Sequence, residues 1–122
     1  MDGSGNTWVT GESLSTWGSP VRPHSSYSDA FVARLDASGT MVWNTFLGGS
    51  GSDSGNSIAM DGLGNAWVTG HSSSTWGNPM NAYSGSGYDV FVARLDGRFS
   101  SYLPIIRLNY PLSNQGIVII TK

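Results

Sequence analysis

The fold is decided by a stretch that the chain contains twice, MDGSGNTWVTG at residues 1–11 and MDGLGNAWVTG at residues 60–70. Over the first twenty positions of the two copies, fifteen residues are identical. Further along, the block FVARLD occurs at residues 31–36 and again at residues 91–96. Separate blocks that recur in the same order show an internal repeat of about sixty residues, which is typical of a solenoid, a propeller or another repeat array.

Each copy has the pattern of β-strands joined by turns. Residues 6–11 and 65–71 are short, rich in Trp, Val and Thr, and each follows a Gly-containing turn that begins with Asp. Such segments are typical of strands. Residues 30–35 and 90–95 alternate between two sets of side chains, and residues 40–47 are again rich in apolar and β-branched types. These segments are therefore predicted as further strands.

A fourth strand is predicted at residues 56–60, as the hairpin partner before the second turn. Four antiparallel strands in a unit of about sixty residues match a β-propeller blade. We therefore predict an all-β fold of antiparallel four-stranded β-propeller blades, in a partial propeller with no significant helix. The predicted units are residues 1–52 and an incomplete 53–98, followed by a non-repeat tail at 99–122.

The tail does not follow the pattern of the repeat. Pro104 cannot donate a ladder hydrogen bond, so its surroundings are predicted at a sheet edge or outside the sheets. Residues 105–108 and 117–121 could pair with each other as a hairpin. The tail is therefore not predicted to be blade-like.

The repeated blocks, with WNTFLGGSGSD at residues 43–53 and IAMD at residues 58–61, resemble the bacterial and archaeal β-propeller repeat called SBBP. The resemblance covers residue 1 to about residue 96. It implies a propeller of several blades in a large secreted or cell-surface protein, and it transfers no catalytic residue. Because this chain holds only two repeats, we expect further blades from a parent chain or self-association of copies.

The composition excludes several classes of function. Charged residues make up 11% of the chain and the net charge is -2, so no basic stripe is present and nucleic-acid binding is not expected. Cysteine is absent, which excludes disulfides, thiolate zinc sites and thiol nucleophiles. The apolar runs are too short for a membrane span, and the amino terminus lacks the features of a signal peptide. A secreted or cell-surface location thus follows from the resemblance alone.

Residues for catalysis or metal binding are few and scattered. Glu12 is the only glutamate, and His24 and His71 occupy non-equivalent positions without metal-ligand spacing. No nucleophile elbow or dinucleotide-binding loop is present. Asp53 with Asp61 is a weak calcium candidate. We predict no catalytic residue, no metal site and no cofactor, and therefore no enzyme activity.

Trp17 and Trp76 occupy matching positions in Ser-Thr-Trp-Gly loops and are the best candidates for ligand binding. Aromatic side chains on one rim could stack on sugar rings or anchor a protein partner. Alternatively, each tryptophan fills the space between neighbouring blades, and we favour this interpretation because propellers commonly repeat such aromatics.

Arg34 and Arg94 lie in the middle of apolar strands. A charge that is covered by a neighbouring blade needs a partner, so each arginine is predicted to pair with an aspartate of its own unit. For Arg34 the candidates are Asp29 and Asp36.

The leading hypothesis for function is a non-enzymatic scaffold or recognition module of a secreted or cell-surface protein, with a protein or carbohydrate ligand. One alternative is a fragment of a carbohydrate-active propeller enzyme whose catalytic residues lie in absent blades. Another is a self-assembling unit whose copies close a ring.

Overall fold

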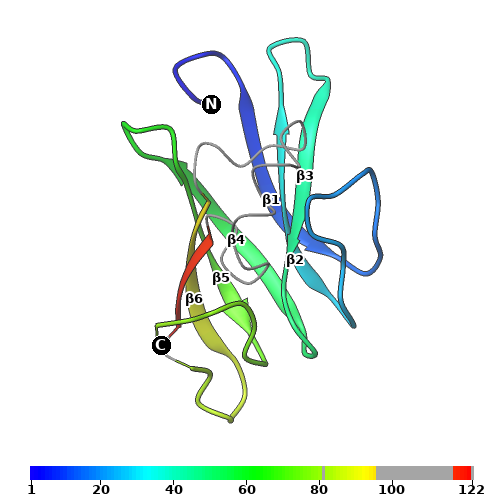
Figure 1. Cartoon of the computed structure of the whole chain (residues 1–122), viewed down its shortest axis with the longest axis vertical. Coiled ribbons are helices and arrows are strands. Elements are labelled where there is room, and N and C mark those ends of the chain that lie inside the picture. Colours follow the sequence, from blue (N-terminus) through cyan, green and yellow to red (C-terminus); the bar gives the residue numbers. More distant parts are fainter. Residues whose placement is uncertain (81, 96–116, 122) are drawn as a thin grey trace, which may run out of the picture.

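The computed structural model describes residues 1–80, 82–95 and 117–121, and this part of the chain is all-β, as predicted (Figure 1). The described strands are β1 (Thr7–Ser13), β2 (Asp29–Leu35), β3 (Met41–Leu47), β4 (Asp53–Met60), β5 (Ala66–Ser72), β6 (Asp89–Leu95) and β7 (Ile117–Thr121). β1 to β6 match the strands predicted from the repeats to within a few residues. β7 lies in the tail, so the prediction that the tail is not blade-like is wrong for these residues.

The strands form two antiparallel sheets, one for each repeat. The first sheet has the order β1-β2-β3 and the second has the order β4-β5-β6-β7. Each predicted unit, 1–52 and 53–98, thus contributes three strands, and the prediction of four strands within a unit is wrong. The reason lies in how the strands are shared among the predicted segments: β5 and β6 match β1 and β2, and the second sheet reaches four strands only through β7, which lies in the predicted tail.

β7 is the outer strand of the second sheet, although its sequence does not repeat that of β3. It pairs with β6 and places Ile119 opposite Ala93, while β3 pairs with β2 and places Asn44 opposite Ala33. Because the two alanines are equivalent, β7 holds the position in its sheet that β3 holds in the first. Residues 105–108 of the predicted tail hairpin lie outside the described residues.

Tight turns with the same structure lead into β1 and β5. In each turn an Asp carboxylate accepts hydrogen bonds from the main-chain N–H groups two and four residues later. Gly5 and Gly64 have positive φ angles of 79° and 83°, which residues with a Cβ adopt only with strain. The repeated Asp-Gly-x-Gly-Asn sequence therefore specifies the same turn twice.

Alternation along the strands gives each sheet two faces, which we name A and B. The A-face residues are, in the two units, Trp8, Thr10, Ala30, Val32 and Arg34, and Trp67, Thr69, Val90, Val92 and Arg94. The B-face residues are Val9, Gly11, Phe31, Ala33 and Leu35, and Val68, Gly70, Phe91, Ala93 and Leu95.

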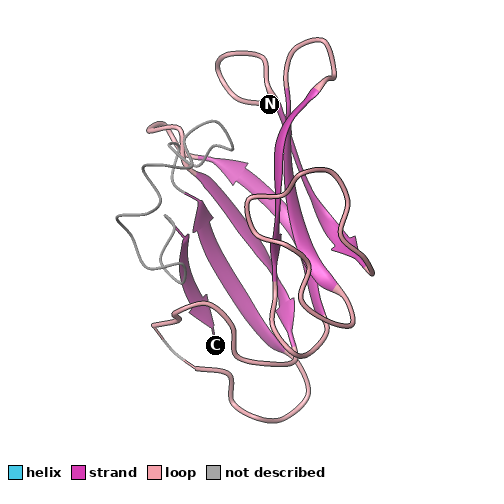
Figure 2. Cartoon of the chain, turned by 45° about the vertical axis from the view of Figure 1, so that its right-hand side comes forward, coloured by secondary structure: helices cyan, strands magenta, loops and turns pink. Residues whose placement is uncertain are grey.

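The core lies between the A face of the first sheet and the B face of the second. Its buried side chains are Ala30, Val32, Trp43, Leu47, Ala66, Val68, Trp76, Phe91, Ala93 and Leu95. β4 lies against β1 and β2, and Figure 2 shows the two sheets beside each other. The sheets approach closely at Gly55, where a Cβ atom would overlap the hydroxyl of Thr10. The other two faces point away from this core.

Candidate functional site

The two repeated tryptophans make the same contacts within their own units. Trp17 donates its indole N–H to Ser13 Oγ at 3.2 Å, and Trp76 donates to Ser72 Oγ at 3.1 Å. Each ring stands edge-on to the phenylalanine of its own B face, with ring centroids 5.1 Å apart in both units. The loop sequence therefore folds each tryptophan over the B face of its sheet.

The surroundings of the two tryptophans differ. Trp76 is only 6% exposed, since the first unit covers it: the guanidinium of Arg22 lies 5.9 Å from its ring centroid, and Gly49 approaches its Cβ. Trp17 is half-buried on the face that points away from the core. The position of Trp76 agrees with the packing interpretation, while ligand binding at Trp17, whose ring is partly accessible, stays a prediction.

A polar cluster lies where the two units meet, beside the loops that follow β1 and β5. We call it the junction cluster, and it consists of Arg22, Asp29, Asp53 and Ser72. Arg22 donates to the carbonyl oxygens of Phe46 at 3.0 Å and Gly48 at 2.6 Å. Asp53 accepts a hydrogen bond from a connector N–H at 3.0 Å and another from the hydroxyl of Ser72. The cluster thereby ties the loop of the first unit to β3 and the connector, and the connector to the first two strands of the second unit.

The carboxylates of the junction cluster are buried on both sides of Gly48. Asp29 is fully buried and accepts hydrogen bonds from the main-chain N–H and the hydroxyl of Ser25, at 2.8 and 2.9 Å. A Cβ on Gly48 would lie 2.5 Å from Asp29 Oδ1 and 2.6 Å from Asp53 Oδ2. Only glycine therefore fits between these two carboxylates without displacing them.

Burial also perturbs the titration of the cluster. It raises the pKa of Asp53, which the neighbouring Asp29 carboxylate raises further, while hydrogen bonds from Ser72 and the connector lower it. Burial lowers the pKa of Arg22, and the charges of Asp29 and Asp53 act in the opposite direction. The arginine charge thus offsets part of the cost of placing two carboxylates in the same buried site.

Asp53 and Asp61, the weak calcium candidate, are not brought together, because β4 separates them. The Asp61 carboxylate is occupied within its own turn, where it accepts hydrogen bonds from Trp67 Nε1 and from Asn65. These bonds lower the pKa of Asp61, as the equivalent bonds do for Asp2. Within the described residues, no group of three or more His, Cys, Asp or Glu side chains could hold a metal ion.

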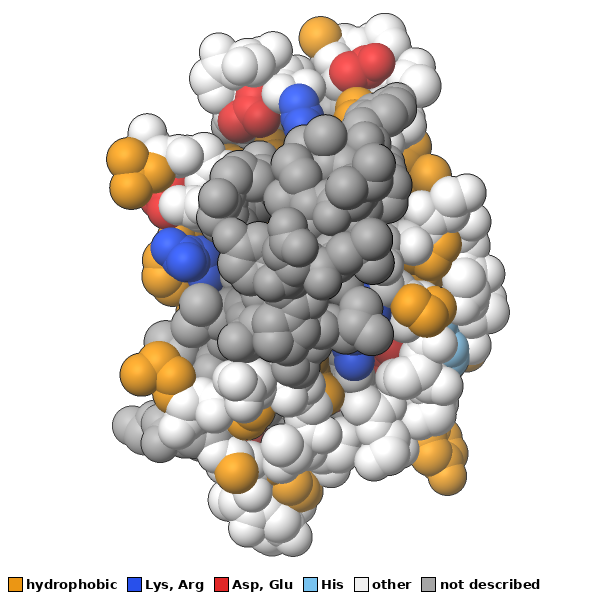
Figure 3. Space-filling model, in the orientation of Figure 1, with side chains coloured by type: hydrophobic (Ala, Val, Ile, Leu, Met, Phe, Trp, Pro, Cys, Tyr) orange, Lys and Arg blue, Asp and Glu red, His pale blue; other side chains and the backbone are white. Residues whose placement is uncertain are grey.

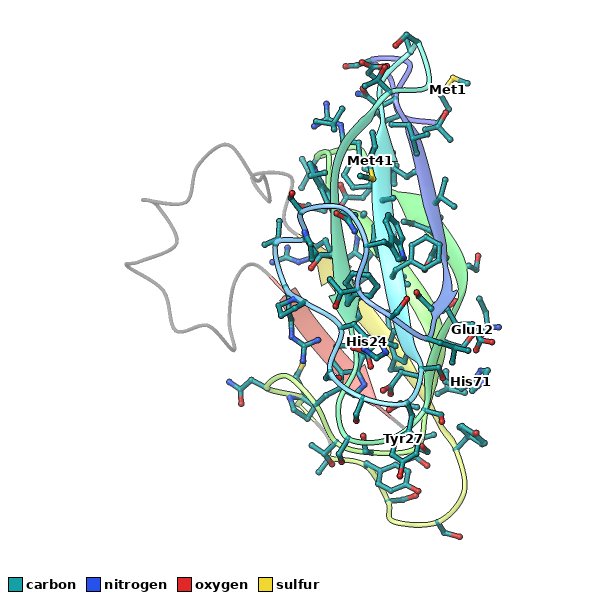
Figure 4. All side chains as sticks on the ribbon, turned by 90° about the vertical axis from the view of Figure 1, so that its right-hand side faces the viewer. Met1, Glu12, His24, Tyr27, Met41 and His71 are labelled. Carbon is teal, nitrogen blue, oxygen red and sulfur yellow. The ribbon has the colours of Figure 1, made fainter. Side chains whose placement is uncertain are left out.

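Two exposed tyrosines were not predicted as site residues from the sequence. They lie at the end of the molecule that carries the two long loops, residues 14–28 and 73–88, which we call the long-loop end. Tyr27 is 74% exposed and has an unusual positive φ of 49°, and Tyr88 is 60% exposed. His71 packs edge-on against Tyr88 at 5.0 Å, and a ring nitrogen of His24 lies 3.0 Å from the carbonyl oxygen of Tyr27. Figure 4 shows His24, Tyr27 and His71 in the same half of the molecule. The available signal was their position, one or two residues before the Asp that begins β2 or β6.

Arg34 does not form its predicted ion pair. Its guanidinium lies 5.8 Å from the ring centroid of Trp8, and its buried Nε has no hydrogen-bond partner. The carboxylate of Asp29 is held within its own loop, and that of Asp36 accepts hydrogen bonds within its own turn. Both aspartates satisfy nearby main-chain donors, so stacking on Trp8 takes the place of the predicted pair.

The predicted partners of Arg94 follow the same pattern where they are described. Asp89 accepts hydrogen bonds from the main-chain N–H and the hydroxyl of Ser84, at 2.7 and 2.8 Å. Asp96 lies outside the described residues. Asp89 therefore serves its own loop, as Asp29 does.

The stretch that builds the contact between the units runs from β3 through the connector and the β4–β5 hairpin to the loop that carries Trp76. Residues 42–78 match the SBBP β-propeller repeat family. The resemblance noted in the sequence is thereby confirmed over this span. The SBBP match crosses from one sheet to the other and includes Asp53 and Ser72 of the junction cluster, whereas Arg22 and Asp29 precede it. No curated protein and no solved structure match the chain.

Figure 3 shows Lys and Arg side chains that are few and separate on the face it displays. The described residues contain no helix that is long and apolar enough to cross a membrane.

Proposed function

We propose that this chain is a non-enzymatic structural module in which β-sheet units stack face to face to form a scaffold. The observation that carries this proposal is the burial of Trp76 between the sheets. The same Trp, Ser and Phe contacts are present in both units. In the second unit Arg22 of the preceding unit also lies over the tryptophan ring. Repeat proteins are stabilised by such contacts between neighbouring units, and the SBBP match crosses from one sheet to the other.

The scaffold would present a recognition surface at its long-loop end. Exposed Tyr27 and Tyr88 lie there among Ser-rich loops, and Trp17 is partly accessible. Aromatic side chains of this kind stack on sugar rings or anchor protein partners. We therefore propose a carbohydrate or protein ligand, and a secreted or cell-surface location that rests on the resemblance to SBBP proteins.

The scaffold proposal is tested by unfolding the chain in urea while tryptophan fluorescence and far-UV circular dichroism are followed. Sheets that share one core unfold in a single transition, with the same midpoint for both probes. Two separate transitions, one for each unit, would contradict a scaffold built by stacking.

The recognition surface is tested by titrating cello-, chito- and malto-oligosaccharides while intrinsic fluorescence is measured. Saturable binding should weaken by about tenfold or more when Tyr27 and Tyr88 are both replaced by Ala, because aromatic anchors dominate such contacts. Leu63→Ala, an exposed change in the β4–β5 turn, serves as the control. Binding that is unchanged in the double variant would exclude the tyrosines from the ligand surface.

A further inference from the structure

Within the described residues, two unlike faces have no other sheet packed against them, the B face of the first sheet and the A face of the second, and we call these the open faces. On the open B face Val9 is 38% exposed, whereas the equivalent Val68 in the core is fully buried. On the open A face Val90 is 58% exposed, whereas the equivalent Ala30 in the core is fully buried. The open faces therefore correspond to the two halves of the contact that the chain already makes internally.

On the two strands before β3 and before β7, and in the tryptophan loop, the open B face has the same residues as the B face that is filled. All seven equivalent positions there are identical in the two units: Val9 and Val68, Gly11 and Gly70, Ser13 and Ser72, Trp17 and Trp76, Phe31 and Phe91, Ala33 and Ala93, and Leu35 and Leu95. On β3 and β7 themselves the residues differ, since Asn44 and Phe46 of β3 hold the register positions of Ile119 and Thr121 of β7. The local geometry is also the same. A Cβ built on Gly11 or on Gly70 would lie 2.8 Å from the ring of the neighbouring phenylalanine.

The open A face is similar to the A face that fills the core. The shared residues are Trp8 and Trp67, Thr10 and Thr69, Val32 and Val92, and Arg34 and Arg94. On the strands before β3 and β7 the differences are at Ala30, which corresponds to Val90, and at Glu12, which corresponds to His71. On β3 and β7 themselves, Trp43 and Thr45 correspond in register to Val118 and Ile120. None of these changes places a new charge at the centre of the face, so the apolar character needed for packing is retained.

We infer that a second copy of this chain docks the A face of its second sheet on the B face of the first sheet, head to tail. This inference rests on the proposed stacking function and names its partner and its contact residues. Each such contact leaves the same two faces open at the ends of the assembly, so copies add until the rotation closes a ring.

The contact between copies is expected to be weaker than the internal one. Arg22 covers Trp76 inside the chain, but the corresponding loop of the second unit, residues 73–88, contains no Arg or Lys. Trp17 of the next copy would therefore receive no guanidinium from that loop, and no peptide connector links the two sheets. Assembly should accordingly depend on protein concentration.

The test uses the full chain and two variants that each block one face, Val9→Glu and Val90→Glu. Both valines are exposed, so the folded chain accommodates the charge. Molar mass is measured by light scattering after size exclusion over a range of concentrations, with Leu63→Glu as an equally charged control away from both faces. Circular dichroism establishes that every variant is folded.

Wild type and Leu63→Glu should form oligomers as concentration rises, while each face variant alone stays monomeric. An equimolar mixture of the two face variants should form a one-to-one dimer, because each supplies the face that the other retains. A wild type that is monomeric up to millimolar concentration would overturn the inference, as would a single variant that associates as well as wild type. A monomer with one unfolding transition would leave the stacking function intact, whereas two transitions would remove both.

Discussion

The two B faces share the residues of two strands and the Trp, Ser and Phe contacts, but in the described part of the chain only one of them packs against another sheet. Trp17 and Trp76 bond to equivalent serines and stand at the same distance from equivalent phenylalanines. Trp76 is nevertheless buried and Trp17 only half-buried, because the loop and connector of the first unit, at Arg22 and Gly49, lie over Trp76. The repeat thus encodes the face, and the neighbour determines its burial. Substitutions at equivalent residues of the two units, or at residues inside and outside the contact between the sheets, should therefore have unequal effects.

The largest effect is expected for the two tryptophans. Trp76→Ala should lower the free energy of unfolding by about 4 kcal/mol, the usual cost of removing a buried Trp, and Trp17→Ala by about 2 kcal/mol. Both values come from urea unfolding at the same pH. Equal losses at the two positions would mean that the first unit adds no stability at Trp76.

Gly55→Ala tests how closely the two sheets approach each other at Gly55. The added Cβ would overlap the hydroxyl of Thr10 and lie 3.3 Å from the carbonyl oxygen of Gly11. We expect a loss of about 2 to 3 kcal/mol from overpacking, measured by urea unfolding. Gly62→Ala, which has open space around the added atom, should cost less than about 0.5 kcal/mol. A similar small cost at Gly55 would show that the sheets are not held this close.

The two serines that hold the tryptophans should differ less. Ser72 is buried and also donates to Asp53, whereas Ser13 donates to the carbonyl oxygen of Ser15 near solvent. Ser72→Ala should cost about 2 kcal/mol and Ser13→Ala about 0.5 kcal/mol, because only the first leaves a buried acceptor without its donor. Thermal melts of both variants check the difference. A larger loss for Ser13→Ala would contradict the role of Ser72 in the junction cluster.

The smallest effect is a difference in pH dependence between the junction and a turn. The lowered pKa of Asp61 stabilises the fold above the unfolded value, and this contribution is lost as the pH falls through the folded value. Asp61→Asn should therefore lower the melting temperature by a few degrees near neutral pH and less in acid.

Asp53 should show the opposite sign. Its raised pKa favours the folded state below the unfolded value, and this contribution is lost as the pH rises through the folded value. The melting temperature of Asp53→Asn should therefore rise relative to wild type as the pH increases from about 3 to 7. Parallel pH profiles of wild type and variant would show that Asp53 titrates normally.

Much of the local structure could be predicted from the sequence, whereas the junction could not. The strands and the Asp-Gly turns follow from alternation and from residues that favour positive φ. Arg22 gave no such signal, because the corresponding loop of the second unit has no Arg or Lys and nothing near Arg22 in the sequence shows that it covers Trp76. The pairing of β7 with β6 was also missed, since the sequence of β7 does not resemble that of β3.

The sequence by itself determined the repeat, the turns, the strands and the two faces that each unit presents. These features depend on neighbours along the chain, which are the same in both copies. Only the tertiary structure decided which face is covered, which tryptophan is buried and which aspartate shares its site with a cation. Those outcomes depend on what packs against each face, and two units with the same pattern meet different neighbours in space.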